Sequence, residues 1–259
     1  VTIDGDLYIN SEIEYKGKQR FVHEGAFNTG ETLKVGIRLS CSNTTLNITG
    51  GSSIKFGPHF HDSNAYFISA VDQKFSGDYL YQGQLKNIRI CGGGTIDFTG
   101  AGCISTTMKL RRYGVTTGLV DGFDCHDITF LGGDLANCIV NNTVFGVDFV
   151  GVARKHNIYN CTFKDNFYDL NNISPYQSTS VDHSSIYINA PETSVWNNTF
   201  TQKSVWAKAM GCAIELHGNN QQFYSNFIVG YCRSVIIAGY KSDQEVPRPE
   251  LETYVRTGI

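Results

Sequence analysis

A carboxylate and an imidazole occur two residues apart in the segment GCAIELHG (211–218), at Glu215 and His217. The segment alternates as a β-strand does, so a period of two divides it into two faces. The expected inner face is wholly apolar and contains Cys212, Ile214 and Leu216. The expected outer face carries Ala213 beside the two titratable residues. Because a carboxylate next to an imidazole can transfer protons, this outer face is a candidate functional site.

Three further segments align with this one, namely GVDFVG (146–151), SSIYINA (184–190) and SVIIAG (234–239). Stacked in parallel, the four segments place their apolar positions in one continuous inner column. The outer column then contains Asp148, Tyr187, Glu215 and Ile236, and the column beside it contains Val150, Asn189, His217 and Ala238. The stack predicts a strip with two carboxylates, a tyrosine, an asparagine and a histidine.

The spacing within this strip suggests hydrolysis of a glycosidic bond. Asp148 and Glu215 are two strands apart, which separates their backbones by about 9.6 Å. Inverting glycoside hydrolysis uses two carboxyl groups about 6.5–9.5 Å apart, one as the acid and one as the base that activates water. Side chains that lean toward each other would reach that separation. Tyr187 would then stack on a sugar ring, and His217 would bind substrate or shift the pKa of Glu215.

A long segment, KDNFYDLNNISPYQSTSVDH (164–183), separates two of the stacked strands. Functional side chains often lie on loops that a rigid scaffold holds. We expect the following residues of this loop to line a cleft beside the strip: Asp165, Asp169, Tyr176, Asp182 and His183. Asp182 is the alternative to Asp148 as the second catalytic carboxyl group, although it and His183 could instead cap a turn. The predicted substrate-binding residues are His217, Tyr187, Asn189, His183, Asp169 and Tyr176.

The scaffold that positions these residues must be rich in β-structure. The chain has 259 residues with 27 Gly, 16 Phe and 14 Tyr, and only 17% are charged, which is a poor mixture for helices. A polar turn followed by a β-branched or aromatic alternation recurs six times, 28 to 42 residues apart, at Leu46, Ile88, Ile128, Ile158, Val195 and Phe223. Such irregular spacing favours a solenoid over a propeller or a leucine-rich repeat. We predict an all-β, right-handed parallel β-helix with variable loops and little helix.

Composition and motifs exclude several functions. The net charge of −3 provides no field for nucleic acid or anionic membranes, and no apolar run reaches the length of a membrane span. The glycine runs lack the helix of a phosphate cradle, and His59 and His61 lack a third metal ligand. We therefore expect no cofactor, no metal, no nucleic-acid partner and no membrane insertion. The predicted segments are an N-terminal cap (1–36), the β-helix (37–240) and a C-terminal exit (241–259) that leads into further chain.

Cysteines and asparagines each allow two interpretations. The eight cysteines form no metal-binding spacing, and several lie in apolar alternation, so we predict buried thiols rather than disulfides, as in a reducing cytosol. Six Asn-X-Ser/Thr sequons begin at Asn43, Asn47, Asn141, Asn160, Asn172 and Asn197. They would be glycan sites in a secreted eukaryotic protein. The simpler interpretation is that Asn occupies β-helix turns, where it tolerates left-handed geometry.

The segments GIRLSCSNTTLNITGGSSIKF (36–56), NIRICGGGTIDFTG (87–100) and CAIELHGNNQQFYSN (212–226) resemble the pectate-lyase-like β-helices of bacteriophage tailspikes and tail (preneck) appendage proteins. The resemblance covers roughly residues 33–240 and is nearest to appendages of short-tailed phages that infect Gram-positive bacteria. It implies a homotrimer on the virion, attached to other tail proteins. Such a protein acts outside the cell on bacterial surface polysaccharide or teichoic acid.

The sequence departs from the pectin-degrading members of this fold. Polygalacturonase-like enzymes carry Asn-Thr-Asp, Asp-Asp and Gly-His-Gly motifs, of which this chain has only LHG (216–218), without the first Gly. Pectate lyases carry Trp-x-Asp-His, of which VDHSS (181–185) contains only Asp-His. Neither pectin activity is therefore predicted. We predict a glycan depolymerase with Glu215 as acid or base and Asp148 or Asp182 as its partner. The alternatives are a non-catalytic adhesin or structural spike that binds glycan through the same strip, and a secreted cellular polysaccharide lyase or hydrolase.

Overall fold

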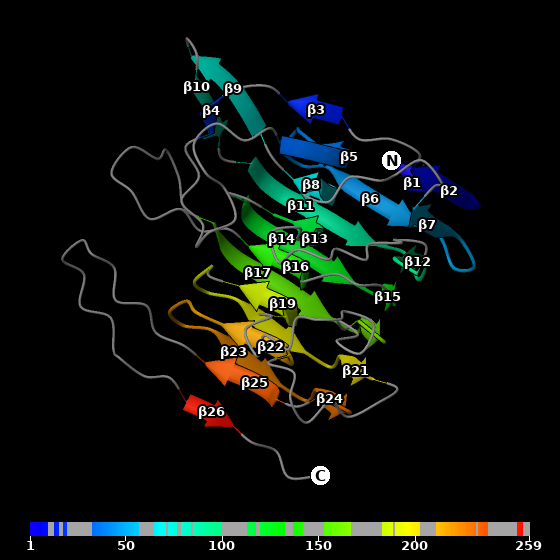
Figure 1. Cartoon of the computed structure of the whole chain (residues 1–259), viewed down its shortest axis with the longest axis vertical. Coiled ribbons are helices and arrows are strands. Elements are labelled where there is room, and N and C mark those ends of the chain that lie inside the picture. Colours follow the sequence, from blue (N-terminus) through cyan, green and yellow to red (C-terminus); the bar gives the residue numbers. More distant parts are fainter. Residues whose placement is uncertain are drawn as a thin grey trace, which may run out of the picture.

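The computed structural model shows a coil of stacked β-strands (Figure 1). It describes residues 1–9, 13–15, 18–19, 33–56, 65–70, 72–76, 79–83, 85–99, 113–117, 120–132, 137–141, 153–166, 183–188, 190–202, 211–231, 233–237 and 253–255. Within these ranges there are strands and turns but no helix, so none of the described residues belongs to a helix that could cross a membrane. The predicted all-β parallel β-helix is confirmed.

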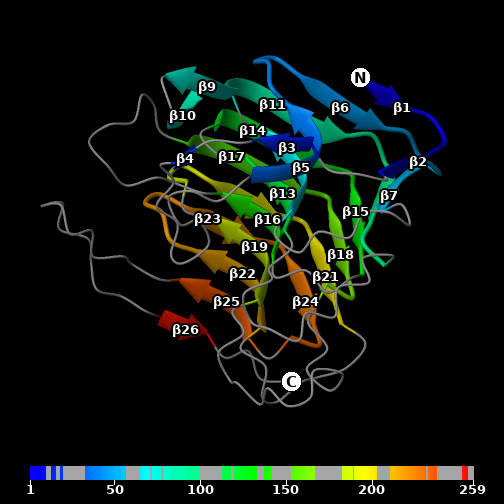
Figure 2. The ribbon, with the colours of Figure 1, turned by 45° about the horizontal axis from the view of Figure 1, so that its top comes forward.

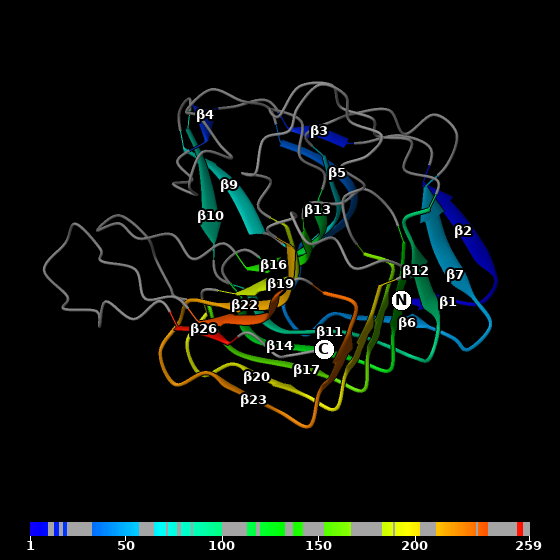
Figure 3. The same ribbon diagram turned by 60° about the horizontal axis from the view of Figure 1, so that its bottom comes forward.

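Three long sheets form the sides of the coil, and a small fourth sheet lies beside them (Figure 3). Sheet A contains β1 (Thr2–Ile3), β6 (Thr45–Ile48), β11 (Leu85–Cys91), β14 (Val120–His126), β17 (Arg154–Tyr159), β20 (Ser194–Trp196) and β23 (Gln222–Tyr224). Sheet B contains β2 (Asp6–Ile9), β7 (Ser53–Phe56), β12 (Thr95–Asp97), β15 (Thr129–Leu131), β18 (Thr162–Lys164), β21 (Thr199–Thr201) and β24 (Phe227–Val229). Figure 2 shows several strands of sheet B side by side.

Sheet C is the longest, and only its two outermost pairs are antiparallel. In spatial order it contains β26 (Thr253–Val255), β25 (Arg233–Ile237), β22 (Gly211–Leu216), β19 (His183–Ile188), β16 (Asn137–Asn141), β13 (Tyr113–Thr116), β8 (Ala65–Ala70), β5 (Leu33–Leu39) and β3 (Ile13–Tyr15). The fourth sheet contains β4 (Lys18–Gln19), β10 (Tyr79–Gly83) and β9 (Asp72–Ser76).

The parallel coil begins at the first strands of the chain. Strand β1 pairs in parallel with β6, and β2 pairs in parallel with β7. Parallel pairing therefore begins within residues 1–36, which were predicted to form an N-terminal cap ahead of the β-helix. The remaining division of the chain into segments stays a prediction.

The chain passes from sheet A to sheet B through single residues in the left-handed conformation. Asp127, Asn160, Asn197 and Ser225 occupy this corner with φ between 53° and 57°. Asn reaches this region at low cost because its short polar side chain can hydrogen-bond locally. The Nδ2 atom of Asn197 donates to Oδ1 of Asn160 at 2.7 Å, which links two successive corners. The turn interpretation is confirmed for these two sequon asparagines.

Apolar side chains fill the coil in columns. A column of fully buried rings from Phe98 through Phe130 and Phe163 to Phe200 is stacked, with the last three centroids 4.7 and 4.6 Å apart. In sheet A, the column that ends with Ile158, Val195 and Phe223 begins with Leu46, Ile90 and Cys125. The predicted repeat anchors Ile88 and Ile128 are therefore two or three residues out of register.

The cysteines that the structure describes are free thiols: Cys41, Cys91, Cys125, Cys161 and Cys212. Cys125 and Cys161 are fully buried inside the coil, with their sulfur atoms 4.0 Å apart. The hydrogen bond shared with the Cys161 thiol, followed by burial, raises the pKa of Cys125. Cys125 therefore remains protonated, and both buried residues behave as small apolar side chains.

Candidate functional site

Sheet C bends at one position along its strands. Between β19 and β22 the register skips Ser185 and Ala213, although the positions on both sides of them are paired. Ala213 and the next residue, Ile214, both belong to the buried core. Two successive side chains therefore point into the coil, and the alternation shifts by one residue. The skipped positions along the sheet are Gly36, Phe67, Gly114, Cys138, Ser185, Ala213 and Ser234.

The bend exchanges two of the predicted faces. Strict alternation placed Cys212 in the interior and Ala213 outside. In the structure Ala213 is in the core, whereas the Cys212 Sγ lies 3.9 Å from Oε2 of Glu215. The prediction for these two residues was wrong because a continuous period of two cannot represent the shift. Ile214 and Leu216 lie in the core as predicted.

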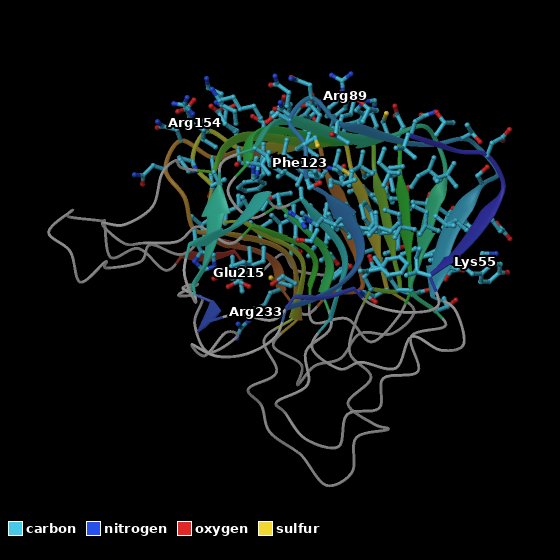
Figure 4. The ribbon with its side chains drawn as sticks, turned by 90° about the horizontal axis from the view of Figure 1, so that it is seen from above. Lys55, Arg89, Phe123, Arg154, Glu215 and Arg233 are labelled. Carbon is cyan, nitrogen blue, oxygen red and sulfur yellow. The ribbon has the colours of Figure 1, made fainter. Side chains whose placement is uncertain are left out.

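The outer side of the bend brings together residues that a straight strand would separate. Residues three apart in an extended strand are about 10 Å apart, yet the side chains of Cys212 and Glu215 are in contact. Figure 4 shows Glu215 and Arg233 on the side of sheet C away from the side chains that fill the coil, whereas Phe123 lies inside. We call this outer strip the sheet C crease. Its described residues are Ser184, Tyr187, Cys212, Glu215, His217 and Arg233.

Glu215 is held by donors on both carboxylate oxygens. The Nε2 atom of His217 donates to Oε1 at 2.8 Å, and the Ser184 hydroxyl donates to Oε2 at 2.5 Å. The Cys212 thiol donates to the Ser184 oxygen at 3.2 Å. The side chains of His217 and Glu215 are only 3% and 9% exposed. Tyr187 pairs with Glu215 in the ladder, and its ring lies 4.7 Å from the ring of His217.

This environment fixes the charge of Glu215. Burial alone would raise the pKa of the carboxyl group. The hydrogen bond and charge of His217, followed by the bonds from Ser184 and Cys212, outweigh burial and lower the pKa below its usual value. Glu215 is therefore ionised at neutral pH. An ionised carboxylate can accept a proton or stabilise positive charge, but it cannot serve as the acid that donates a proton.

The structure describes four of the predicted side chains, and it brings three of them together: Tyr187, Glu215 and His217. Five other predicted residues lie outside the described residues: Asp148, Asp169, Tyr176, Asp182 and Asn189. His183 is the first residue of β19, but its side chain is not described. Asp165 occupies the turn after β18 with a φ of 56°. The catalytic and binding roles of all these residues stay predictions.

The predicted column beside Glu215 contains one error. The ladder pairs Tyr187 with Val140 of β16 on the side away from Glu215. Val140 therefore holds the place predicted for Asp148, and the alignment of residues 146–151 with this column is wrong. Segments 137–141 and 146–151 have similar apolar alternation, so the pattern alone could not distinguish them. The alignment of the strands that contain Ile186, Ile214 and Val235 is confirmed.

Ser184 and Cys212 were not predicted as site residues. Both precede the bend, and Cys212 was predicted to face the interior. A possible signal is the run of small residues where neighbouring strands meet, SS at 184–185 and GCA at 211–213. Within the described ranges, no group of three His, Cys, Asp or Glu side chains is arranged to hold a metal ion.

The outer face of sheet A carries the other conspicuous array of side chains. A ladder of rings runs through His126, Tyr159, Trp196 and Tyr224, with centroids 4.9, 4.4 and 5.9 Å apart and nearly parallel planes. The faces of successive rings cover one another, whereas Tyr224 at the end of the described ladder is 49% exposed. Beside the ladder, two arginine–aspartate pairs link adjacent strands, and Figure 4 shows both arginines on this face: Arg89–Asp124 and Arg154–Asp121. Stacked rings and compensated charges indicate a role in joining strands.

The fold defines a class of protein, the parallel β-helices to which phage tailspikes also belong. The structure is similar to the tailspike protein of E. coli bacteriophage HK620 in complex with a pentasaccharide, with 24% identity and a TM-score of 0.62 over 90% of this chain. A mutant of that tailspike in complex with the pentasaccharide is 24% identical, with a TM-score of 0.64 over 90% of this chain. A deletion mutant is 23% identical, with a TM-score of 0.65 over 92% of this chain. The resemblance to tailspike β-helices is confirmed for the fold.

The chain spans about a third of the length of these tailspikes, with 34% of each covered. No protein-family model matches the sequence, and no curated protein sequence matches it.

Proposed function

We propose that this chain is the glycan-binding and glycan-degrading part of a bacteriophage tail protein that acts outside the cell on the host surface. The fold supports this proposal, because similar tailspike structures contain bound pentasaccharide. The observation that carries it is the Glu215–His217 pair on the outer face of sheet C, 2.8 Å apart and almost buried. Burying a carboxylate together with an imidazole contributes little to the stability of a scaffold, so we infer that this pair serves chemistry.

In the proposed reaction, Glu215 is the base. It accepts a proton from a water molecule whose oxygen attacks the anomeric carbon, while the glycosidic C–O bond breaks. A second carboxyl group must protonate the leaving oxygen, because Glu215 is already ionised. We assign that role to Asp182, which precedes Ser184 of the crease by two residues in the chain. Asp148 becomes the weaker choice, since Val140 takes its predicted place in sheet C.

The remaining crease residues would bind the substrate. Tyr187 and His217 provide ring surfaces beside the carboxylate. Arg233 of β25 is paired with Cys212 of the neighbouring strand β22. Its guanidinium group is suited to binding carboxylate or phosphate groups. We therefore propose an anionic surface polysaccharide or a wall teichoic acid as the substrate. We also propose that the protein is a homotrimer attached to other tail proteins on the virion.

A non-catalytic adhesin is the second candidate, and one observation favours it. Both oxygens of the Glu215 carboxylate already accept hydrogen bonds from protein donors. A carboxylate satisfied in this way could hold the crease together for binding alone. A secreted cellular lyase or hydrolase is less favoured, because the similar structures are phage tailspikes.

The test is a depolymerisation assay on purified bacterial surface polysaccharides and wall teichoic acids. Wild type, Glu215→Gln and Asp124→Asn would be compared, with Asp124 as a control carboxylate on the outer face of sheet A. Reducing ends, unsaturated products, and released glycerol or ribitol phosphate would identify the bond that breaks. We expect the cleavage rate of Glu215→Gln to be about 100-fold or more below that of wild type, and the Asp124→Asn control to retain activity. Equal cleavage by all three would place the site elsewhere, and binding without cleavage would favour the adhesin.

A further inference from the structure

We infer that Ser184 is a positioning residue, which holds the Glu215 carboxylate in its orientation and in its charged form from the neighbouring strand. This inference rests on the proposed function only for its catalytic consequence. Its physical content, control of one carboxylate by one hydroxyl, applies whether or not the crease cleaves glycan.

The hydrogen-bond directions around Ser184 support this role. A serine hydroxyl has one hydrogen to donate and lone pairs to accept. The Cys212 thiol donates to the Ser184 oxygen at 3.2 Å. Because an ionised carboxylate has no hydrogen, the Ser184 hydroxyl must donate to Oε2 of Glu215 at 2.5 Å. Ser184 is fully buried, so water does not compete for this bond.

The bond also fixes the plane of the carboxylate. Ser184 holds Oε2 from β19, while His217 holds Oε1 from the end of β22. With one donor on each oxygen and on different strands, rotation of the carboxylate would break both bonds. A base that removes a proton from water needs such a fixed orientation, because small displacements reduce proton transfer strongly.

The bend in sheet C makes this contact possible and supplies a matched control. Ser184 faces the crease, whereas the next residue, Ser185, faces the interior and shares a 2.7 Å hydrogen bond with the hydroxyl of Tyr231. Both serines are fully buried, and each loses a side-chain hydrogen bond when changed to alanine. Only the Ser184 change removes a donor from Glu215.

The experiment is a carbon-13 NMR titration of the Glu215 carboxyl group, assigned by its loss in Glu215→Gln. Spectra of wild type, Ser184→Ala, Ser184→Thr and Ser185→Ala would be recorded. In Ser184→Ala we expect the titration midpoint to rise by about one pH unit or more, since a bond to the charged form is lost. Ser184→Thr retains the hydroxyl and should restore the wild-type midpoint. Ser185→Ala should leave it unchanged.

Cys212→Ala provides a second variant if Ser184→Ala does not fold. It removes the donor to the Ser184 oxygen and also the 3.9 Å contact of the thiol with Oε2 of Glu215, so a smaller shift in the same direction is expected. If no Ser184 or Cys212 variant moves the midpoint, or if Ser185→Ala moves it equally, the inference is overturned. The titration needs no glycan, so failure of the proposed activity would not affect it. Where wild type cleaves a glycan, the acid limb of its pH profile should move with the NMR midpoint.

Discussion

The buried histidine in sheet A predicts an acid sensitivity of the fold that can be measured without a substrate. His156 of β17 is fully buried, and its ring lies edge-to-face against Phe123 with centroids 5.5 Å apart. Its Nε2 atom lies 3.1 Å from the Val120 carbonyl oxygen, which requires Nε2 to carry the hydrogen. Among the described residues, Nδ1 has no hydrogen-bond partner. Protonation would place a charge and an unpaired donor in the core.

Burial lowers the pKa of His156 from 6.5 to about 4, although the Val120 hydrogen bond and the charges of Asp121 and Asp124 act in the opposite direction. The unfolded chain therefore binds this proton below about pH 6.5, whereas the folded chain binds it only near pH 4. Stability is lost as the pH falls between these values. A difference of about 2.5 units, at about 1.36 kcal/mol per unit, amounts to about 3 kcal/mol.

The assay is urea denaturation at pH values from 7.5 to 4, comparing wild type with His156→Leu. The leucine variant cannot titrate at this position, so its free energy of unfolding should fall less with pH. The expected difference in the pH-dependent loss is about 3 kcal/mol between pH 7 and pH 4. The absolute stabilities at neutral pH do not enter this comparison. Identical pH dependence of the free energy of unfolding in the two proteins would show that His156 is not the source of the acid sensitivity.

Two further predictions concern the core and one corner of the coil. Phe163→Ala should destabilise the fold by about 3–5 kcal/mol, because the ring is fully buried and stacked between two others. Urea denaturation measures this change, and a decrease of less than about 1 kcal/mol in the free energy of unfolding would contradict the contribution of the stack. Gly92→Ala should cost at least about 2 kcal/mol, since its φ is +118° and a Cβ would overlap the carbonyl oxygen of Ile48. Gly51→Ala, with a φ of +85° and no atom nearby, is the control and should cost about 1 kcal/mol.

The sequence predicts the fold well because the apolar columns repeat. Ile186, Ile214 and Val235 stack as the alternation indicates, and Asn160 and Asn197 occupy left-handed corners. These features depend on local side-chain type, which a single sequence contains. The apolar columns recur from strand to strand along the described part of the coil.

The site is less predictable because it depends on the bend. The alternation of GCAIELHG does not reveal that Ala213 and Ile214 both point inward, so Cys212 was assigned to the wrong face. Residues 137–141 and 146–151 are similar apolar segments, and either could pair with β19 on alternation alone. Long-range pairing between strands decides which of them does. Register of this kind is set by loops and by contacts with other strands, which alternation does not encode.

We propose that glycan binds in the sheet C crease beside Glu215. The most direct measurement is a crystal structure of Glu215→Gln with an oligosaccharide of the polymer that wild type binds or cleaves. We expect a sugar ring in contact with Tyr187 and His217, with a glycosidic oxygen near residue 215. An oligosaccharide on the outer face of sheet A beside Trp196, with no sugar in the crease, would contradict it.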